Sequence, residues 1–228
     1  MSLANKLTFF RVILAPVFFI VYLLPNFFPS WFISGTGWTV PALWLIFIVS
    51  EITDMLDGMA ARKRNETSDF GKLFDPFADT LMQLTCFLCF VIDGIFPVIL
   101  FLLVIYREFA ILFLRNLMLK KGATLGANLG GKIKTTAYII AEGAALLTVS
   151  LQRLSLFEFL VPFFKIGALI IFIISVVISV ASFINYLSLY KKISNPRGGP
   201  TGDPAGISAM QSGAADNQRN IQEKDNKL

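Results

Sequence analysis

Long runs of apolar residues, separated by short polar segments, follow one another along the first 190 positions of the chain. A helix needs about 20 mainly apolar residues to cross the roughly 30 Å hydrocarbon core of a bilayer. A backbone in contact with lipid must also satisfy its own hydrogen bonds, which favours helices. The pattern therefore predicts an all-α integral membrane protein with six transmembrane helices, at residues 9–28, 38–61, 76–93, 95–118, 134–152 and 160–190.

The composition supports a membrane protein. Hydrophobic residues make up 55% of the 228 residues and charged residues only 15%, which is too apolar for an ordinary soluble domain. The first apolar run is longer than the apolar core of a cleaved signal peptide and lacks a clear small-residue cleavage site. We therefore expect it to stay in the mature protein.

Basic residues favour the loops on one side of the predicted membrane domain, because the opposite loops hold little beyond Arg153 and Lys165. Cytoplasmic loops of membrane proteins carry an excess of lysine and arginine. We therefore expect both termini to be cytoplasmic, in a multi-pass protein of the cell (inner) membrane. The residues assigned to the cytoplasmic side are Lys6, Arg62, Lys63, Arg64, Lys72, Lys120, Lys121, Lys132, Lys134, Lys191 and Lys192.

Residues 194–228 lose the apolar content abruptly and gain Gly, Pro, Asn and Asp. Such a segment cannot bury enough surface to offset its chain entropy, so we expect a disordered cytoplasmic tail after a transmembrane domain at 1–193. The tail's four basic and four acidic residues cancel, which leaves the net charge of +5 in the membrane domain. That charge suits anionic headgroups or phosphorylated substrates, although the bias towards basic cytoplasmic loops accounts for most of it.

The chain contains no histidine. It therefore lacks the usual zinc ligand and the commonest general base, so any catalysis must use carboxylates, Lys, Tyr or Cys. Cys86 and Cys89 form a C-x-x-C pattern inside an apolar segment. We interpret them as buried small hydrophobes, because no second ligand pair accompanies them.

Two rows of polar and small residues lie at the adjoining ends of the second and third predicted helices. Residues three or four apart on a helix share one face, and a short basic turn joins these two helices. We therefore expect the two rows to face each other. The rows consist of Asp54, Asp57, Gly58, Ala61 and Arg62 on the second helix, and of Gly71, Asp75 and Asp79 on the third.

Four converging carboxylates near a bilayer repel one another unless cations neutralise them. An all-oxygen site without His or Cys favours Mg²⁺ or Mn²⁺, and two such ions form a common clamp for phosphoryl transfer. Gly58 and Ala61 leave room for a ligand to approach the backbone, and Arg62 can bind a phosphate with two hydrogen bonds. The alternative, in which Asp69 or Asp75 caps a helix, explains single acids but not the whole set.

These residues spell D-x2-D-G-x2-A-R-x8-G-x3-D-x3-D, and the sequence here resembles the CDP-alcohol phosphotransferase family. The resemblance implies a six-helix membrane fold and transfer of a substituted phosphoryl group from a CDP-linked donor to an alcohol, with release of CMP. It also implies a role for each residue of the pattern. Asp54, Asp57, Asp75 and Asp79 would hold two Mg²⁺ or Mn²⁺ ions, Asp79 would be the catalytic base, and Gly58, Ala61, Arg62 and Gly71 would contact the CDP.

Three further segments resemble bacterial phosphatidylglycerophosphate synthases. They are "NKLTFFR" at 5–11, "REFAILFLRNLMLKKG" at 107–122 and "GKIKT" at 131–135. The resemblance implies substrate contacts from the first segment and a basic pocket from the other two, suited to an acceptor such as sn-glycerol 3-phosphate. The residues concerned are Asn5, Thr8 and Arg11 as possible substrate contacts, and Arg107, Arg115, Lys132 and Lys134 as acceptor-phosphate ligands.

Each of these residues also has a simpler interpretation. Lys132 and Lys134 can be ordinary cytoplasmic loop lysines, and Arg107 can pair with Glu108. Arg11 can reach the headgroups, while Asn5 and Thr8 can cap the first helix. The chain also departs from the synthases at two positions, with Thr80 where they have Lys and Tyr138 where Gln is common.

We therefore favour an enzyme that transfers the phosphatidyl group of CDP-diacylglycerol to glycerol 3-phosphate, and family resemblance leads us to expect a homodimer. One alternative is the same chemistry with inositol phosphate, serine, phosphatidylglycerol or choline as the acceptor. Another is a divalent cation transporter, since acids within a membrane often mark ion paths. Against the transporter, the acids gather at one membrane face and no polar path continues through the other half.

Overall fold

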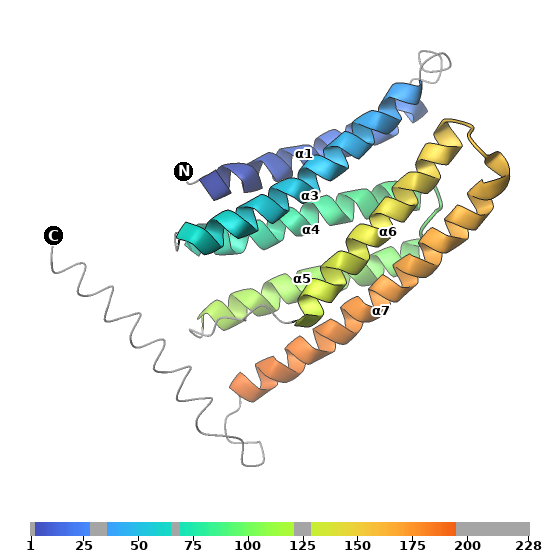
Figure 1. Ribbon diagram of the computed structural model, residues 1–228. Helices are drawn as coiled ribbons and strands as arrows, with labels where there is room; N and C mark the ends of the chain where they lie inside the picture. Colours follow the sequence, from blue (N-terminus) through green and yellow to red (C-terminus); the bar gives the residue numbers. More distant parts are fainter. Residues whose placement is uncertain (1–2, 28–35, 65–68, 121–128, 195–228) are drawn as a thin grey trace. The chain divides into compact units, whose positions relative to one another are not determined.

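The computed structural model describes residues 3–27, 36–64, 69–120 and 129–194, and Figure 1 shows the helices that they form. The described residues contain no strand, which confirms the all-α prediction, and each predicted apolar segment falls on one long helix. The elements are α1 (Leu3–Phe27), η1 (Thr36–Trp38), α3 (Thr39–Arg64), α4 (Asp69–Ile92), α5 (Val98–Lys120), α6 (Leu129–Arg153), η2 (Glu158–Leu160) and α7 (Val161–Ser194).

Three helices begin earlier than the apolar pattern predicts. Helix α1 begins at Leu3, so Asn5 and Thr8 lie inside it and the interpretation that they cap it is wrong. Helix α4 begins at Asp69, so Asp75 and Pro76 lie inside it. The interpretation of Asp75 as a helix cap is therefore wrong. Helix α6 begins at Leu129, which places Lys132 and Lys134 in its first turns and not in a loop. All three helices extend beyond their predicted apolar runs, because a helix can continue wherever its backbone hydrogen bonds are satisfied.

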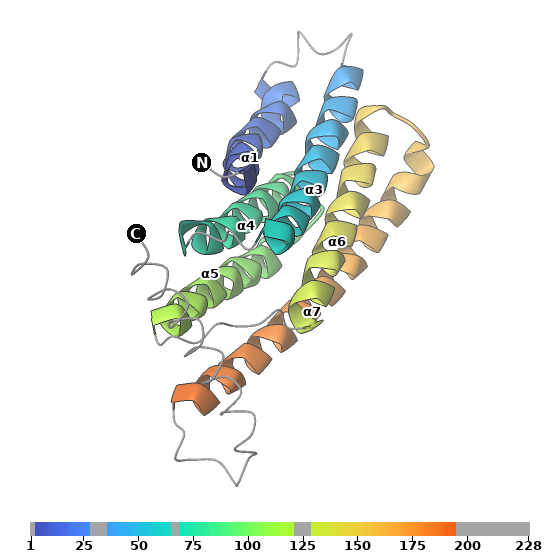
Figure 2. The ribbon, with the colours of Figure 1, turned by 60° about the vertical axis from the view of Figure 1, so that its left-hand side comes forward.

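Residues Met1–Leu187 form one compact unit, and Ser188–Leu228 form a second. In the first unit, α1 packs against both α3 and α4, and α4 packs in turn against α5 and α6. Figures 1 and 2 show this arrangement from two sides. The adjoining ends of α3 and α4 therefore lie beside the N-terminal helix, and the ends of α5 and α6 lie close by.

Stacked aromatic rings hold the middle of this unit together. The rings of Phe96 and Phe172 are stacked with centroids 4.0 Å apart. Phe87 contacts Phe172 and Tyr138 with centroid distances of 5.0 and 5.1 Å. Such pairs contribute about 0.5–1.5 kcal/mol each beyond the burial of their area. The cluster connects α4 to α6 and α7 and so fixes the helices that carry the polar residues described below.

The two cysteines are part of the same core. Cys86 and Cys89 are free thiols and fully buried among apolar neighbours. This confirms their interpretation as small hydrophobic residues.

Two described helical stretches, Thr8–Phe27 and Glu158–Ser188, are long and apolar enough to cross a membrane, and Pro76–Ile92 is a shorter apolar helix. Large apolar side chains are also exposed on the outer faces of several helices, as with Ile99 at 70% and Phe113 at 65%. Exposed apolar surface on this scale is unusual for a soluble monomer. These features indicate association with a membrane, and the count of six spans stays a prediction.

Candidate active site

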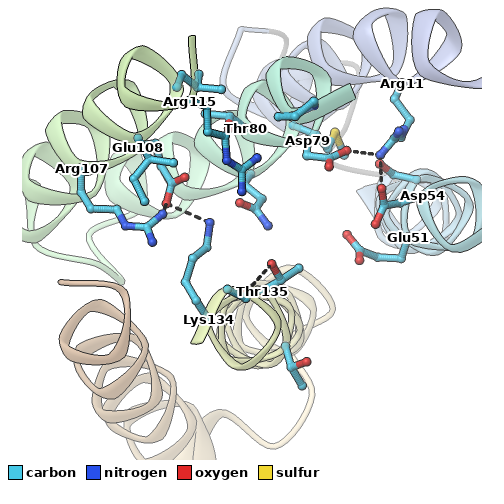
Figure 3. A pocket seen from close by; sticks show the side chains of 18 of the residues that line it. Arg11, Glu51, Asp54, Asp79, Thr80, Arg107, Glu108, Arg115, Lys134 and Thr135 are labelled. Carbon is cyan, nitrogen blue, oxygen red and sulfur yellow. Dashed lines mark hydrogen bonds and ion pairs between the residues drawn. The ribbon is translucent and has the colours of Figure 1, made fainter. Parts of the chain in front are cut away.

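A cavity of about 590 Å³ lies among the six long helices, with charged side chains around it. Charges inside an apolar bundle are costly and are usually functional. Figure 3 shows acids with one arginine on one side, and an acid with three cations on the other. The charged residues that line the cavity are Arg11, Glu51, Asp54, Asp79, Arg107, Glu108, Arg115 and Lys134.

The acidic side brings together one residue from each of three helices. Arg11 on α1 donates through the same nitrogen, Nη1, to Oδ1 of Asp54 on α3 and to Oδ1 of Asp79 on α4. The Arg11 side chain is only 2% exposed. The interpretation that Arg11 reaches the headgroups is therefore wrong, because its guanidinium is buried between two carboxylates. The expectation that the two acidic rows face each other is confirmed for Asp54 and Asp79.

The chemistry of these two carboxylates suits a divalent cation. Both Oδ1 atoms converge on one positively charged atom, as oxygen ligands of Mg²⁺ or Mn²⁺ must do. Among the described side chains, no three His, Cys, Asp or Glu residues form a metal-binding group. The other two predicted ligands, Asp57 and Asp75, lie outside the described side chains. The donor set thus fits the predicted metals, and the assignment of the ligands stays a prediction.

Several other predicted site residues lie on described helices, while their side chains lie outside the described part of the structure. Their backbone positions agree with the predicted rows, because α3 ends at Arg64 and α4 begins at Asp69. The proposed roles of these residues stay predictions. They are Asn5, Gly58, Ala61, Arg62, Gly71 and Lys132.

Glu51 also lines the acidic side, one turn before Asp54 on α3. It lies outside the family signature at residues 54–79. The available signal was an acid within an otherwise apolar run, which in a membrane protein is rare and usually functional.

A buried ion-pair network forms the basic side. Glu108 Oε1 accepts hydrogen bonds from Arg107 Nη1 at 2.8 Å and from Lys134 Nζ at 2.9 Å. Arg107 Nε also donates to the backbone oxygen of Ser179 on α7 at 3.1 Å. The pairing of Arg107 with Glu108 is therefore confirmed, and it extends to α6 and α7. Of the predicted phosphate ligands, Arg115 makes no ion pair with any described residue, so its charge is available to a ligand.

The two departures from the synthase pattern both lie in or beside this cavity. Thr80 is nearly buried and lines the cavity next to Asp79. The Nζ atom of Lys134 lies over the ring of Tyr138, 4.6 Å from the ring centroid. The hydroxyl of Tyr138 donates to Ser179 Oγ at 2.7 Å. Tyr138 thus supports the basic side from below, a role that no sequence spacing indicated. Thr8 is also buried, on the helix that carries Arg11.

A second cavity, of about 570 Å³, lies at the turn between α4 and α5 and the start of α7. Its lining is mostly apolar, and Lys165 is the one charged residue among the described residues around it. Without an acid or a second cation there, this cavity offers no catalytic groups. The first cavity is therefore the candidate active site.

The sequence matches a known enzyme family and several of its members. The family model for CDP-alcohol phosphatidyltransferases matches residues 1–180. A relative from Treponema pallidum (strain Nichols) is 36% identical over 197 residues, which cover 83% of this chain and 89% of the relative. Another, from Haemophilus influenzae (strain ATCC 51907 / DSM 11121 / KW20 / Rd), is 33% identical over 189 residues, or 81% and 91% of the two chains.

A third relative, from Bacillus subtilis (strain 168), is 37% identical over 148 residues, which cover 64% of this chain and 77% of the relative. All three relatives are named CDP-diacylglycerol–glycerol-3-phosphate 3-phosphatidyltransferase. Family membership explains both the signature at residues 54–79 and the charged cavity that its acids line. The chain belongs to the CDP-alcohol phosphatidyltransferase family and is an enzyme of that class.

Proposed function

We propose that the enzyme transfers the phosphatidyl group of CDP-diacylglycerol to sn-glycerol 3-phosphate, which releases CMP and forms phosphatidylglycerophosphate in phospholipid biosynthesis. The observation that carries the proposal is the division of one cavity into an acidic and a basic side. The acidic side suits the pyrophosphate of the donor together with its cations, and the basic side suits an acceptor that carries its own phosphate. The names of the three relatives describe the same reaction.

The donor is proposed to bind at the adjoining ends of α3 and α4. Asp54 and Asp79, together with Asp57 and Asp75, would hold two Mg²⁺ or Mn²⁺ ions. When bound, such ions neutralise the pyrophosphate and the charge that develops on the leaving CMP. The family signature assigns contacts with the CDP to Gly58, Ala61, Arg62 and Gly71.

Asp79 is proposed to accept the proton of the acceptor hydroxyl. The hydroxyl oxygen then forms a bond to the phosphorus of the phosphatidyl group, while the bond from that phosphorus to the CMP oxygen breaks. Arg11 donates to Asp79 and so keeps this carboxylate in place at the cavity. Positioning of both substrates supplies much of the rate enhancement in reactions of this kind.

The acceptor phosphate is proposed to bind Arg115, with Lys134 and Arg107 beside it and Lys132 on the same helix as Lys134. Since Glu108 already pairs with Arg107 and Lys134, Arg115 is the described cation with most charge to offer. An acceptor without a phosphate, such as serine or choline, would leave Arg115 without an anionic partner in the cavity, which favours a phosphorylated alcohol.

Six membrane spans are proposed for the six long helices, with the cavity at the cytoplasmic end. Basic residues cluster near the ends of α3 and α6 that carry the site, and cytoplasmic loops carry such an excess. A homodimer is also proposed, on family resemblance. Mass measurement of the purified protein in detergent distinguishes one copy from two.

The test of the reaction uses purified protein with CDP-diacylglycerol and Mg²⁺ or Mn²⁺. Glycerol 3-phosphate, inositol phosphate, serine, phosphatidylglycerol and choline are each supplied in turn, and CMP release is measured. We expect release with glycerol 3-phosphate to exceed that with every other acceptor. Faster release with any other acceptor would refute the choice of acceptor, and no release with any of them would refute the proposed reaction.

A further inference from the structure

Tyr186 on α7 lines the active-site cavity, although it lies outside the segments that resemble the synthases. The residue is only 3% exposed. The hydroxyls of Tyr22 and Tyr138 bond to Asp93 and Ser179. The hydroxyl of Tyr186 is not among the buried polar atoms that lack a partner, so it is accessible from the cavity that the residue lines. No described residue forms a hydrogen bond with the hydroxyl of Tyr186. This polar group is therefore placed at the cavity without a partner from the described protein.

Gly131 provides the space for this hydroxyl. A Cβ atom at Gly131 would lie 3.2 Å from the hydroxyl oxygen of Tyr186, which is tighter than an ordinary contact. Any larger residue at position 131 would therefore push the tyrosine away. Gly131 lies in the first turn of α6 and lines the same cavity. The absence of a side chain here leaves room for the hydroxyl.

The position of the hydroxyl is close to the basic side of the cavity. Lys134 lies three residues after Gly131 on α6, and residues with this spacing share one helix face. Lysine and arginine only donate hydrogen bonds, whereas a tyrosine hydroxyl both donates and accepts. An acceptor alcohol whose phosphate binds the cations still presents a hydroxyl that does not react. Tyr186 offers that hydroxyl a partner which the cations cannot supply.

We propose that Tyr186 is a specificity-determining residue whose hydroxyl hydrogen-bonds the non-reacting hydroxyl of a phosphorylated polyol acceptor, with Gly131 leaving room for it. The inference rests on the proposed function and adds the group that recognises the non-reacting hydroxyl of the acceptor. A site built to hydrogen-bond a substrate hydroxyl discriminates against an analogue that lacks it. The enzyme should therefore prefer glycerol 3-phosphate to the same molecule without its middle hydroxyl.

The test compares glycerol 3-phosphate with 3-hydroxypropyl phosphate in the wild-type enzyme and in Tyr186→Phe. For one hydrogen bond between uncharged groups, we expect the wild type to prefer glycerol 3-phosphate about five- to tenfold in kcat/KM. Tyr186→Phe should lose that preference, with little change for 3-hydroxypropyl phosphate or in the KM for CDP-diacylglycerol. An equal loss for both acceptors, or no loss for either, overturns the inference.

Two further variants separate recognition from folding. Gly131→Ala moves the hydroxyl, so it should lower the preference roughly two- to fivefold, and it should add little in the Tyr186→Phe background because the crowded oxygen is gone. Ser182→Ala is the matched control, because Ser182 is buried one turn earlier on α7 and is not among the residues that line the cavity. It should leave the preference unchanged. Additive losses from Gly131→Ala and Tyr186→Phe would contradict the contact between them.

The order of measurement separates this inference from the proposed function. CMP release by the wild type with glycerol 3-phosphate is measured first. No release refutes the proposed function and this inference with it. Release accompanied by an unchanged preference in Tyr186→Phe overturns this inference alone.

Discussion

Arg11 reaches from α1 to carboxylates on two other helices, and one nitrogen donates to both of them. The two acids are each about 40% exposed at the cavity, whereas the arginine is buried. Two like charges on converging side chains repel each other unless a cation lies between them. The guanidinium is thus a resident counter-ion of the acidic side, and a bound divalent cation would share these carboxylates with it.

Arg11→Gln should make the stability of the folded protein more dependent on divalent cations. Without the guanidinium, the two carboxylates repel, and we expect the free energy of unfolding to fall by about 1–2 kcal/mol in the presence of a chelator. Mg²⁺ should restore more stability to the variant than to the wild type. Thermal unfolding in detergent, with and without Mg²⁺, measures this difference. Equal responses of both proteins to Mg²⁺ would show that Arg11 does not act as the counter-ion.

Asp79→Asn should remove the proposed proton acceptor while keeping the shape of the side chain. We expect kcat for CMP release to fall roughly 100- to 10,000-fold. Asp93→Asn is the matched control, because Asp93 accepts a hydrogen bond from Tyr22 and is not among the residues that line the cavity. Turnover retained in Asp79→Asn would refute the assignment of the base.

Arg115→Ala should weaken the binding of the acceptor far more than the binding of the donor. Loss of a charge-assisted hydrogen bond of about 1.5–3 kcal/mol corresponds to a rise of roughly 10- to 100-fold in the KM for glycerol 3-phosphate. The KM for CDP-diacylglycerol should stay unchanged. Lys165→Ala, which removes a cation from the second cavity, should alter neither constant. An unchanged KM for the acceptor in Arg115→Ala means that the phosphate binds elsewhere.

Residue spacing predicts which side chains share a helix face, and so the pairing of the Asp54 and Asp79 rows could be predicted. It does not predict which residues from distant helices enter the same cavity. Arg11 lies 43 residues before Asp54 and 68 before Asp79. Only the packing of α1 against α3 and α4 brings these residues together. Tyr186 could not be predicted for the same reason. It lies near the end of a long apolar helix, and only the packing of that helix brings it to the cavity.

At the scale of helices, Glu108 links α5 to α6, while Arg107 links α5 to α7. All three charged groups of this network are at most 10% exposed. Removing one partner of a buried ion pair leaves an uncompensated charge, which is more costly than the pair itself is stabilising. The network therefore holds the basic side of the cavity in shape.

Glu108→Gln should accordingly destabilise the helices around the basic side. We expect the free energy of unfolding to fall by about 3 kcal/mol, because Arg107 and Lys134 lose their buried counter-charge. Thermal unfolding of the purified variant measures the loss. Glu158 is exposed, so Glu158→Gln is the matched control and should unfold at the wild-type temperature. A wild-type unfolding temperature for Glu108→Gln would contradict a structural role for the network.

The helices themselves could be predicted closely, because long apolar runs leave the backbone few alternatives in a membrane. The boundaries were wrong where polar residues continue a helix. Asp69 to Asp75 belong to α4, and Leu129 to Ile133 belong to α6, although neither stretch is part of an apolar run. Hydrophobicity reports the length of the apolar run, whereas a helix ends where its backbone hydrogen bonds end.

At the scale of the whole molecule, the proposed six spans predict which turns face which side of the membrane. A cysteine at Leu156, between α6 and α7, should react with an impermeant thiol reagent from outside the cell. A cysteine at Lys191 should react only from the cytoplasmic side. Leu156 and Lys191 are both exposed, and the parent protein is a suitable control because Cys86 and Cys89 are buried. Reaction of both new cysteines from the same side would refute the six-span topology.

The contact of Arg11 with both acids has a practical consequence for handling the protein. Since Arg11 brings α1 into contact with both acids of the candidate active site, a rigid fusion partner ahead of α1 that tilts this helix would disturb the site directly. An affinity tag for purification therefore belongs at the other terminus, and an N-terminal reporter needs a flexible linker.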